Sequence, residues 1–256
     1  MSDPVLYQRQ EQIGLITLNK PKANQLSNEV FEYMDAILDR IVKEDGLRAV
    51  VITGAGDKIF SAGADLSGGF GDYTPLEFLK RGQETWTRIE NLGLPVVAAM
   101  NGHAFGGGLE LAMACHFRIL NQESRIGLTE TNLGIIPGYG GTLRLPRYVG
   151  KPRAIEMMAF GEQVPAEKAY EMGLVNRLCD KAQVLEESLE FARQLAARPP
   201  LAIRALLSLM AESQDLSMDQ HLEKERASLV NLFETKDMME GMTAFMQKRQ
   251  PEFKGE

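Results

Sequence analysis

Two short segments rich in glycine and alanine could present backbone N–H groups to a substrate. The first covers residues 61–66, and the second covers residues 101–110 and contains a glycine triplet at 106–108. Small side chains leave the peptide groups of such turns uncovered, and the start of a helix favours negative charge. Each segment alone is also compatible with an ordinary tight turn. Two of them in order, each after a predicted strand, favour an oxyanion hole.

An oxyanion hole suits reactions beside a thioester carbonyl, where each preorganised N–H donor supplies about 2.7 to 4 kcal/mol. Glu110 follows the glycine triplet in an otherwise apolar stretch, and Glu130 precedes another glycine-rich loop at 134–141. Either glutamate alone is also compatible with a solvated surface. Two carboxyl groups that grip one water could remove its proton and supply another to carbon, if their environments hold their pKa values apart.

The elements that must hold these residues alternate between strands and helices. Residues 5–18 contain two short alternating segments around a glycine, which predict an antiparallel hairpin. Apolar residues at three- and four-residue spacing after Ser27 predict a helix. Apolar runs at 49–53 and 95–100, with a helix-like stretch at 75–91 between them, predict buried parallel strands.

The second half of the chain continues this pattern and then becomes helical. A short helix is expected at 109–115 and a returning strand at 117–120. From about residue 151 onward only helices are expected, over residues 153–160, 166–172, 184–197, 201–210 and 218–233.

Composition and charge exclude several classes of protein. The content of 44% apolar and 25% charged residues is that of an ordinary globular chain. With 28 basic and 35 acidic residues, the net charge of -7 disfavours nucleic-acid binding. Cys115 and Cys179 form no zinc-ligand pattern, so a reduced, metal-free cytoplasmic protein is expected. We expect no targeting signal and no membrane-spanning segment, because no apolar run approaches about 20 residues.

The order of these segments closely resembles the enoyl-CoA hydratase/isomerase, or crotonase, family over nearly the whole chain. Besides the two turns and the two glutamates, the resemblance rests on residues 18–24, 144–150, 166–176 and 240–249. It implies an α/β protein with the crotonase (ClpP-like) fold, in which stacked βαβ turns form a superhelical core before a C-terminal helical trimerisation region.

The resemblance also implies how the chain is organised and assembled. We expect the α/β core to cover residues 1–195. A helical region over residues 196–256 is expected to complete the active site and the oligomer interface. The expected assembly is a homotrimer or a dimer of trimers.

Individual residues take roles from the same resemblance. The oxyanion N–H groups are those of Ala64 and Gly107. As a hypothesis, Glu110 activates water for attack at C3 and Glu130 delivers a proton at C2. The CoA contacts include two residues at the adenine and the 3′-phosphate, Phe245 and Lys248, usually from a neighbouring subunit. The full set expected to bind the substrate and its CoA is Lys22, Ala23, Asn24, Ala62, Asp65, Leu66, Phe245 and Lys248.

Retention of both glutamates favours an enoyl-CoA hydratase, because other reactions on this scaffold commonly replace one or both. Such an enzyme adds water reversibly and syn across the 2,3 double bond of a trans-2-enoyl-CoA, giving a 3-hydroxyacyl-CoA. The expected setting is fatty-acid or related acyl-CoA metabolism, such as β-oxidation. CoA belongs to the substrate, so no separate cofactor is expected. A Δ3,Δ2-enoyl-CoA isomerase or a specialised 3-hydroxyacyl-CoA dehydratase fits the same residues.

Two alternatives within the family are not enzymes. One branch binds RNA through a lysine-rich first helix, whereas this helix carries Glu29, Glu32, Asp35 and Asp39, which should repel RNA. A catalytically silent subunit is disfavoured by the intact glutamates and turns. Chain length and branching of the acyl group stay open.

Overall fold

The fold is built on two sheets. The structure is a computed structural model that describes residues 2–20, 22–65, 73–213 and 216–256. In the large sheet, β1 and β2 form the expected antiparallel hairpin and the other neighbours are parallel. Its strands, in spatial order, are β1 (Val5–Gln10), β2 (Ile13–Leu18), β3 (Ala49–Gly54), β5 (Val96–Met100), β7 (Phe117–Asn121) and β10 (Arg177–Cys179). The small sheet consists of β4 (Ile59–Ser61), β6 (His103–Phe105), β8 (Arg125–Gly127) and β9 (Val164–Pro165).

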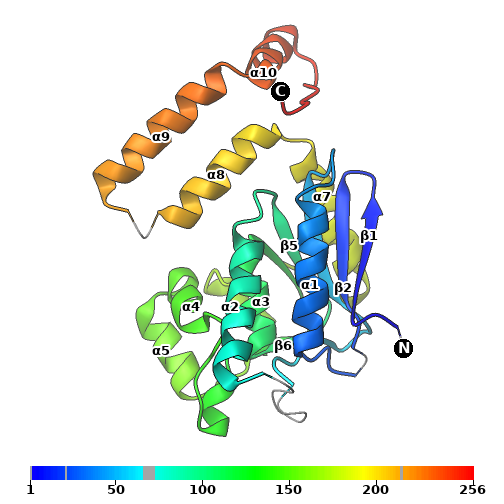
Figure 1. Ribbon diagram of the computed structural model, residues 1–256, viewed down its shortest axis with the longest axis vertical. Helices are drawn as coiled ribbons and strands as arrows, with labels where there is room; N and C mark the ends of the chain where they lie inside the picture. Colours follow the sequence, from blue (N-terminus) through cyan, green and yellow to red (C-terminus); the bar gives the residue numbers. More distant parts are fainter. Residues whose placement is uncertain (1, 21, 66–72, 214–215) are drawn as a thin grey trace.

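Helices connect and cover these strands, and Figure 1 shows their arrangement. Those of the first half are α1 (Asn28–Ile41), α2 (Pro75–Glu90), α3 (Gly107–Ala114), the 3-10 helix η1 (Glu130–Leu133) and α4 (Gly141–Val149). Those of the second half are α5 (Lys151–Ala159), α6 (Ala166–Glu171), the 3-10 helix η2 (Lys181–Gln183), α7 (Val184–Ala196), α8 (Pro200–Glu212), α9 (Met218–Phe233) and α10 (Lys236–Gln247).

Three strands of the large sheet are each followed in the chain by a strand of the small sheet. β3 leads to β4, β5 leads to β6 and β7 leads to β8, and the receiving strands lie side by side and parallel. Each passage is followed by a helix, which gives the stacked strand–helix core that was expected. The sequence did not predict the small sheet, because strands of two or three residues are too short to show an alternating pattern.

Apolar side chains cover both faces of the large sheet. Every residue of β3 and β5 is buried, as is usual for parallel strands between helical layers. On one face, side chains of α1, α2 and α3 join the main core, and on the other face Val184, Leu189 and Ala192 of α7 pack against the sheet. These layers hold the strand ends, and therefore the segments that follow them, in fixed positions.

The prediction of an all-helical second part is wrong at two short strands. β10 pairs in parallel with β7 at the edge of the large sheet, and β9 pairs antiparallel with β8. Both are too short to have been recognised from side-chain alternation. Two helices were also missed, α4 and α10. α4 begins at Gly141 and contains Pro146, so its helical propensity is low and tertiary contacts decide it.

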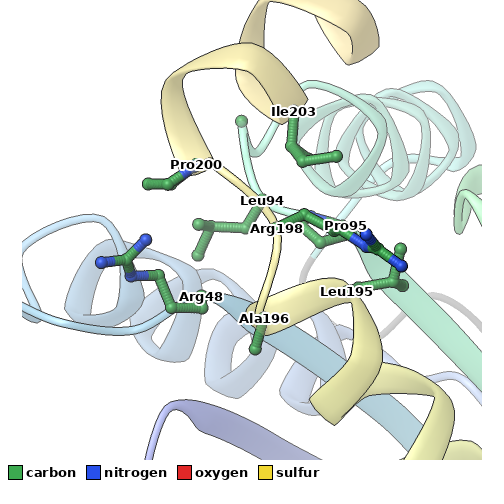
Figure 2. Close-up of a pocket in the computed structure, with 9 residues that line it drawn as sticks. Arg48, Leu94, Pro95, Leu195, Ala196, Arg198, Pro200 and Ile203 are labelled. Carbon is green, nitrogen blue, oxygen red and sulfur yellow. The ribbon is translucent and has the colours of Figure 1, made fainter. Parts of the chain in front are cut away.

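The last three helices extend away from the core (Figure 1). Every residue of α8 and α9 is described, and none of them is buried. None of the described helices is long and apolar enough to cross a membrane. A narrow cavity of about 10 Å³ lies where α8 meets the core (Figure 2), and this volume corresponds to about one water molecule. Its lining includes Arg48, Leu94, Pro95, Leu195, Ala196, Arg198, Pro200 and Ile203.

Candidate active site

Three segments that bear candidate residues leave the small sheet at one edge. Ala64 follows β4, Gly107 follows β6 and Glu130 follows β8. Because these strands are parallel neighbours, their carboxyl ends point the same way, and ligands of α/β proteins bind at such ends. The topology therefore gathers residues that are far apart in the sequence.

The two glycine-containing turns pack backbone against backbone. A Cβ atom added to Gly63 would lie 3.0 Å from the nitrogen of Gly107, and one added to Gly108 would lie 2.3 Å from the carbonyl oxygen of Ser61. Gly63 also has a φ of +89°, which L-residues with side chains rarely adopt. Only glycine allows the turns to approach this closely.

The two predicted oxyanion donors line one cavity of about 820 Å³. Gly107 is the first residue of α3, where an N–H group has no acceptor within its own helix. The N–H groups on either side of Ala64 serve the fold: Gly63 donates to the Oγ of Ser61 at 3.2 Å, and Asp65 donates to the carbonyl of Leu26 at 2.9 Å. Ala64 and Gly107 thus both lie in the wall of the same cavity.

The cavity combines two carboxyl groups with an apolar wall. Glu110 and Glu130 both line it, next to the turns that carry Ala64 and Gly107. Its volume lies within the range of small-molecule sites, about 300 to 1,000 Å³. The apolar side chains, suited to an acyl chain, are Phe78, Leu79, Leu133, Ile135, Ile136 and Pro137.

Glu110 is held by the loop that precedes α4. The residue is 1% exposed, which excludes the alternative of a solvated surface. Its Oε1 accepts hydrogen bonds from the N–H groups of Tyr139 at 2.8 Å and of Gly141 at 2.6 Å. A Cβ atom on Gly141 would lie 2.9 Å from that oxygen, so glycine is needed there. The carboxylate therefore sits at the N-terminus of α4, where the helix dipole favours negative charge.

Glu130 opens the 3-10 helix η1 and is half-buried. Its Oε1 lies over Gly106, where an added Cβ would come within 2.9 Å. Among the residues that the structure describes, no hydrogen-bond partner faces its buried Oε2. The cavity-lining Glu130 thus has hydrogen-bonding capacity available to a substrate.

Burial changes the acidity of both glutamates. It raises the pKa of Glu110 to about 7, against the N–H donor of Gly141, while the charge of Glu130 raises this pKa further. The N–H donor of Tyr139 and the guanidinium of Arg144 act in the lowering direction. Burial also raises the pKa of Glu130, against a hydrogen bond from its own backbone. Two carboxyl groups with raised pKa values in one cavity suit proton transfer near neutral pH.

Comparison with known proteins assigns the chain to a family. The sequence model of the enoyl-CoA hydratase/isomerase family matches residues 8–256. The chain belongs to this family. A Bacillus subtilis (strain 168) protein named "Probable enoyl-CoA hydratase" is 40% identical over 252 residues, which cover 95% of this chain and 96% of that protein.

Further members of the enoyl-CoA hydratase/isomerase family support the assignment. The short-chain-enoyl-CoA hydratase of Clostridium acetobutylicum is 34% identical, over 97% of this chain and 96% of its own length. The crystal structure of an enoyl-CoA hydratase from Bacillus anthracis has a TM-score of 0.95 and 37% identity, and the match covers 99% of this chain and 100% of that one. The predicted crotonase fold is therefore confirmed.

Five of the predicted CoA-binding residues lie in two neighbouring backbone segments, and among these Ala62 lines the cavity. The N–H of Ala62 donates to Ala23, and Asn24 is buried, with its side-chain amide donating to the carbonyls of Ala55 and Ile59, each at 2.9 Å. Lys22 is exposed beside them. The N–H of Asp65 donates to the carbonyl of Leu26, which follows Asn24 in the chain by two residues. Leu66 lies outside the described residues.

Phe245 and Lys248 are not near this cavity within one chain. Phe245 lies on α10, is 84% exposed and does not line the cavity, and Lys248 ends the helix with a φ of +54°. Figure 1 shows α10 at the opposite end of the molecule from β6 and α3. Their predicted role at CoA therefore requires a neighbouring subunit, as the family resemblance implied.

The sequence did not predict the groups that hold Glu110. They are the N–H groups of Tyr139 and Gly141, and the side chain of Arg144, which donates to the carbonyl of Tyr139 at 2.9 Å. The available signal was the glycine-rich loop before a helix start, since such a start binds a carboxylate well. The identity of that carboxylate could not be read from the loop.

The raised pKa of Glu110 predicts a pH-dependent cost to stability. Since the folded pKa is about 7 and the ordinary value is 4.5, protonation favours the folded state and stability falls as pH rises between these values. The loss reaches about 3 kcal/mol above the folded pKa. The Glu110→Gln variant should therefore gain stability relative to the natural protein at about pH 8 but not at about pH 4.5.

Chemical denaturation at both pH values measures this difference. The amide oxygen introduced by Glu110→Gln can keep accepting the two N–H bonds, so the comparison isolates the charge. Glu156→Gln, at an exposed position on α5, controls for the removal of one carboxylate. A stability difference that is the same at both pH values would contradict the prediction.

Proposed function

We propose that this protein is an enoyl-CoA hydratase, which adds water reversibly and syn to the 2,3 double bond of a trans-2-enoyl-CoA and forms a 3-hydroxyacyl-CoA. The observation that carries the proposal is that Glu110, Glu130, Ala64 and Gly107 line one cavity. The names of the similar proteins support the same reaction.

In the proposed mechanism, the thioester oxygen accepts hydrogen bonds from the N–H groups of Ala64 and Gly107, which stabilise the enolate. Glu110 takes a proton from water, and the water oxygen bonds to C3. The electrons of the double bond move to C2 and the thioester oxygen, and Glu130 gives its proton to C2. Glu110 then carries the extra proton, and its transfer to Glu130 restores the enzyme.

Both glutamates have raised pKa values, so both can exchange protons near neutral pH. A general base is most effective with a pKa near the working pH, and the pKa of Glu110 is about 7. A general acid must keep its proton, and burial raises the pKa of Glu130. The two fixed N–H donors favour the charged form of Glu110, whose assigned role requires it to be ionised.

A panel of thioesters tests the function. We expect rapid loss of enoyl absorbance with crotonyl-CoA and formation of 3-hydroxybutyryl-CoA, with no change for a saturated acyl-CoA. Conversion of a trans-3-enoyl-CoA into the conjugated 2-enoyl thioester, without hydration of crotonyl-CoA, would assign an isomerase instead. No reaction with any enoyl-CoA would overturn the proposal and favour a catalytically silent member.

We also propose that residues 196–256 form a helical region that completes the active site of a neighbour in a homotrimer or a dimer of trimers. Its exposed apolar side chains support an oligomer interface. A mass by light scattering that matches one chain would contradict this assembly. The exposed apolar side chains of this region are Leu206, Met210, Leu222, Leu229, Val230, Phe233, Met239, Met242, Phe245 and Met246.

A cytoplasmic location, a role in fatty-acid metabolism and independence from a separate cofactor stay predictions from the sequence.

A further inference from the structure

Arg144 is a buried cation that connects α2 to the loop behind the active site. Its side chain is 5% exposed. Its Nε and Nη2 donate to one oxygen, the Oε2 of Glu90 at the end of α2, at 3.0 and 2.8 Å. Its Nη1 donates to the carbonyl of Tyr139 at 2.9 Å. One guanidinium thus joins a helix end to a loop peptide, and Glu90 balances its charge.

The loop peptide that Arg144 contacts is the one that holds Glu110. Tyr139 gives its carbonyl to Arg144 and its N–H to Glu110, and Gly141 gives the second N–H. Between them, Gly140 has a φ of +99°, and a Cβ atom there would lie 2.5 Å from Nη1 of Arg144. The guanidinium therefore lies directly against this backbone, in a space that only glycine leaves free.

The ring of Tyr139 fixes the same loop from its other side. A Cβ atom on Gly82 of α2 would come within 2.4 Å of this ring, and one on Gly107 within 2.9 Å. The ring also makes edge contacts with Phe31, Phe78 and Trp86, with centroids 5.5 to 6.5 Å apart. The loop is thus packed against the turn that carries the proposed oxyanion donor and tied by Arg144 at its carbonyl.

We propose that Arg144, anchored by Glu90, is a positioning residue that fixes the Tyr139–Gly141 backbone and thereby orients the carboxylate of Glu110 towards the substrate. This inference rests on the proposed role of Glu110 in hydration. Arg144 lies behind the loop, and its effect passes through two peptide N–H groups and its own charge.

The charges around Glu110 predict the direction of the effect. The groups that face it are the Glu130 carboxylate from η1, the Arg144 guanidinium from α4 and the buried Tyr139. Arg144 favours the ionised form directly, and it also holds the N–H groups that favour the same form. Its loss should therefore raise the pKa of Glu110 as well as disorder its orientation.

The test combines kinetics with a titration that needs no activity. For Arg144→Met we expect kcat to fall about 100-fold with KM changed less, as for a small misplacement of a reacting group. In ¹³C NMR of labelled glutamate carboxyls, with the Glu110 signal identified by its loss in Glu110→Gln, the midpoint should rise by about one pH unit. Arg144→Lys, which keeps the charge without the planar fork, should show smaller changes in both quantities.

Glu90→Gln and Arg147→Met complete the comparison. Glu90→Gln leaves Arg144 a neutral acceptor and a weaker anchor, so its kcat should lie between those of the natural protein and Arg144→Met. Arg147 is on the same helix and also pairs with Glu90, through Oε1 at 3.6 Å. It is not among the groups that shift the pKa of Glu110, so its loss should leave the Glu110 midpoint unchanged. A folded Arg144→Met with the natural midpoint would overturn the inference. If that variant does not fold, an unchanged midpoint in Arg144→Lys together with an unchanged kcat in Glu90→Gln would do so.

Failure of this inference can be distinguished from failure of the proposed function. If the natural protein hydrates no enoyl-CoA, the proposed function fails. The titration would then still decide whether Arg144 sets the ionisation of Glu110.

Discussion

Replacing Glu110 with glutamine is expected to lower kcat for hydration of crotonyl-CoA by about 10³- to 10⁴-fold, the effect of losing a positioned general base. Glutamine keeps an acceptor oxygen for the N–H groups of Tyr139 and Gly141, so the loop and helix α4 should keep their positions. What is lost is the capacity to take a proton from water. KM should change much less, because the oxyanion donors and the apolar wall are untouched.

Assays of enoyl absorbance measure this fall in kcat. Far-UV circular dichroism checks that the variant is folded. The matched control is Glu156→Gln, an exposed glutamate on α5 whose loss should leave kcat unchanged. Turnover within a few-fold of the natural protein would remove Glu110 from the mechanism.

Replacing Glu130 with glutamine is expected to lower kcat by about 10²- to 10⁴-fold, because the proposed proton donor to C2 is lost. The amide can occupy the same space over Gly106, and Oε2 has no partner among the described residues that the change would disrupt. The variant should also lower the midpoint of the Glu110 titration. The reason is that the charge of Glu130 raises the pKa of Glu110, and glutamine carries none.

This shift is opposite in sign to the one expected for Arg144→Met, which provides an internal check. Binding of the 3-hydroxyacyl-CoA product, measured by calorimetry, should persist in Glu130→Gln. Near-normal turnover in both glutamine variants would show that the chemistry does not depend on this pair of carboxyl groups.

Short-range patterns in the sequence were enough to predict the core and the two glycine-containing turns. β3, β5 and α7 follow apolar periodicities that local propensity already favours, and the structure confirms them. The turns around Ala64 and Gly107 were recognisable because only small residues permit such exposed peptides. Family resemblance then assigned Glu110 and Glu130, which alone are ordinary acidic residues.

The small sheet was beyond prediction because strands of two or three residues are set by their neighbours and not by their own sequence. This sheet is what places the residues after β4, β6 and β8 at one edge. Helix α4 could not be predicted either, because its glycine and proline disfavour a helix. Its first residue is held by the hydrogen bond from Gly141 to Glu110, and the preceding loop is held by the bond from Arg144 to Tyr139.

The amino-acid order alone was sufficient to identify the chemical groups that the protein carries: two glutamates and two turns with uncovered peptides. It took the folded arrangement to show that these groups share one cavity and that Glu110 is buried. The folded arrangement also shows that Tyr139 and Gly141 donate to Glu110 and that Arg144 contacts the same loop. Burial and charge–charge interaction depend on distances between segments far apart in the chain. Those same distances raise the pKa of Glu110 to about 7, and no local pattern encodes them.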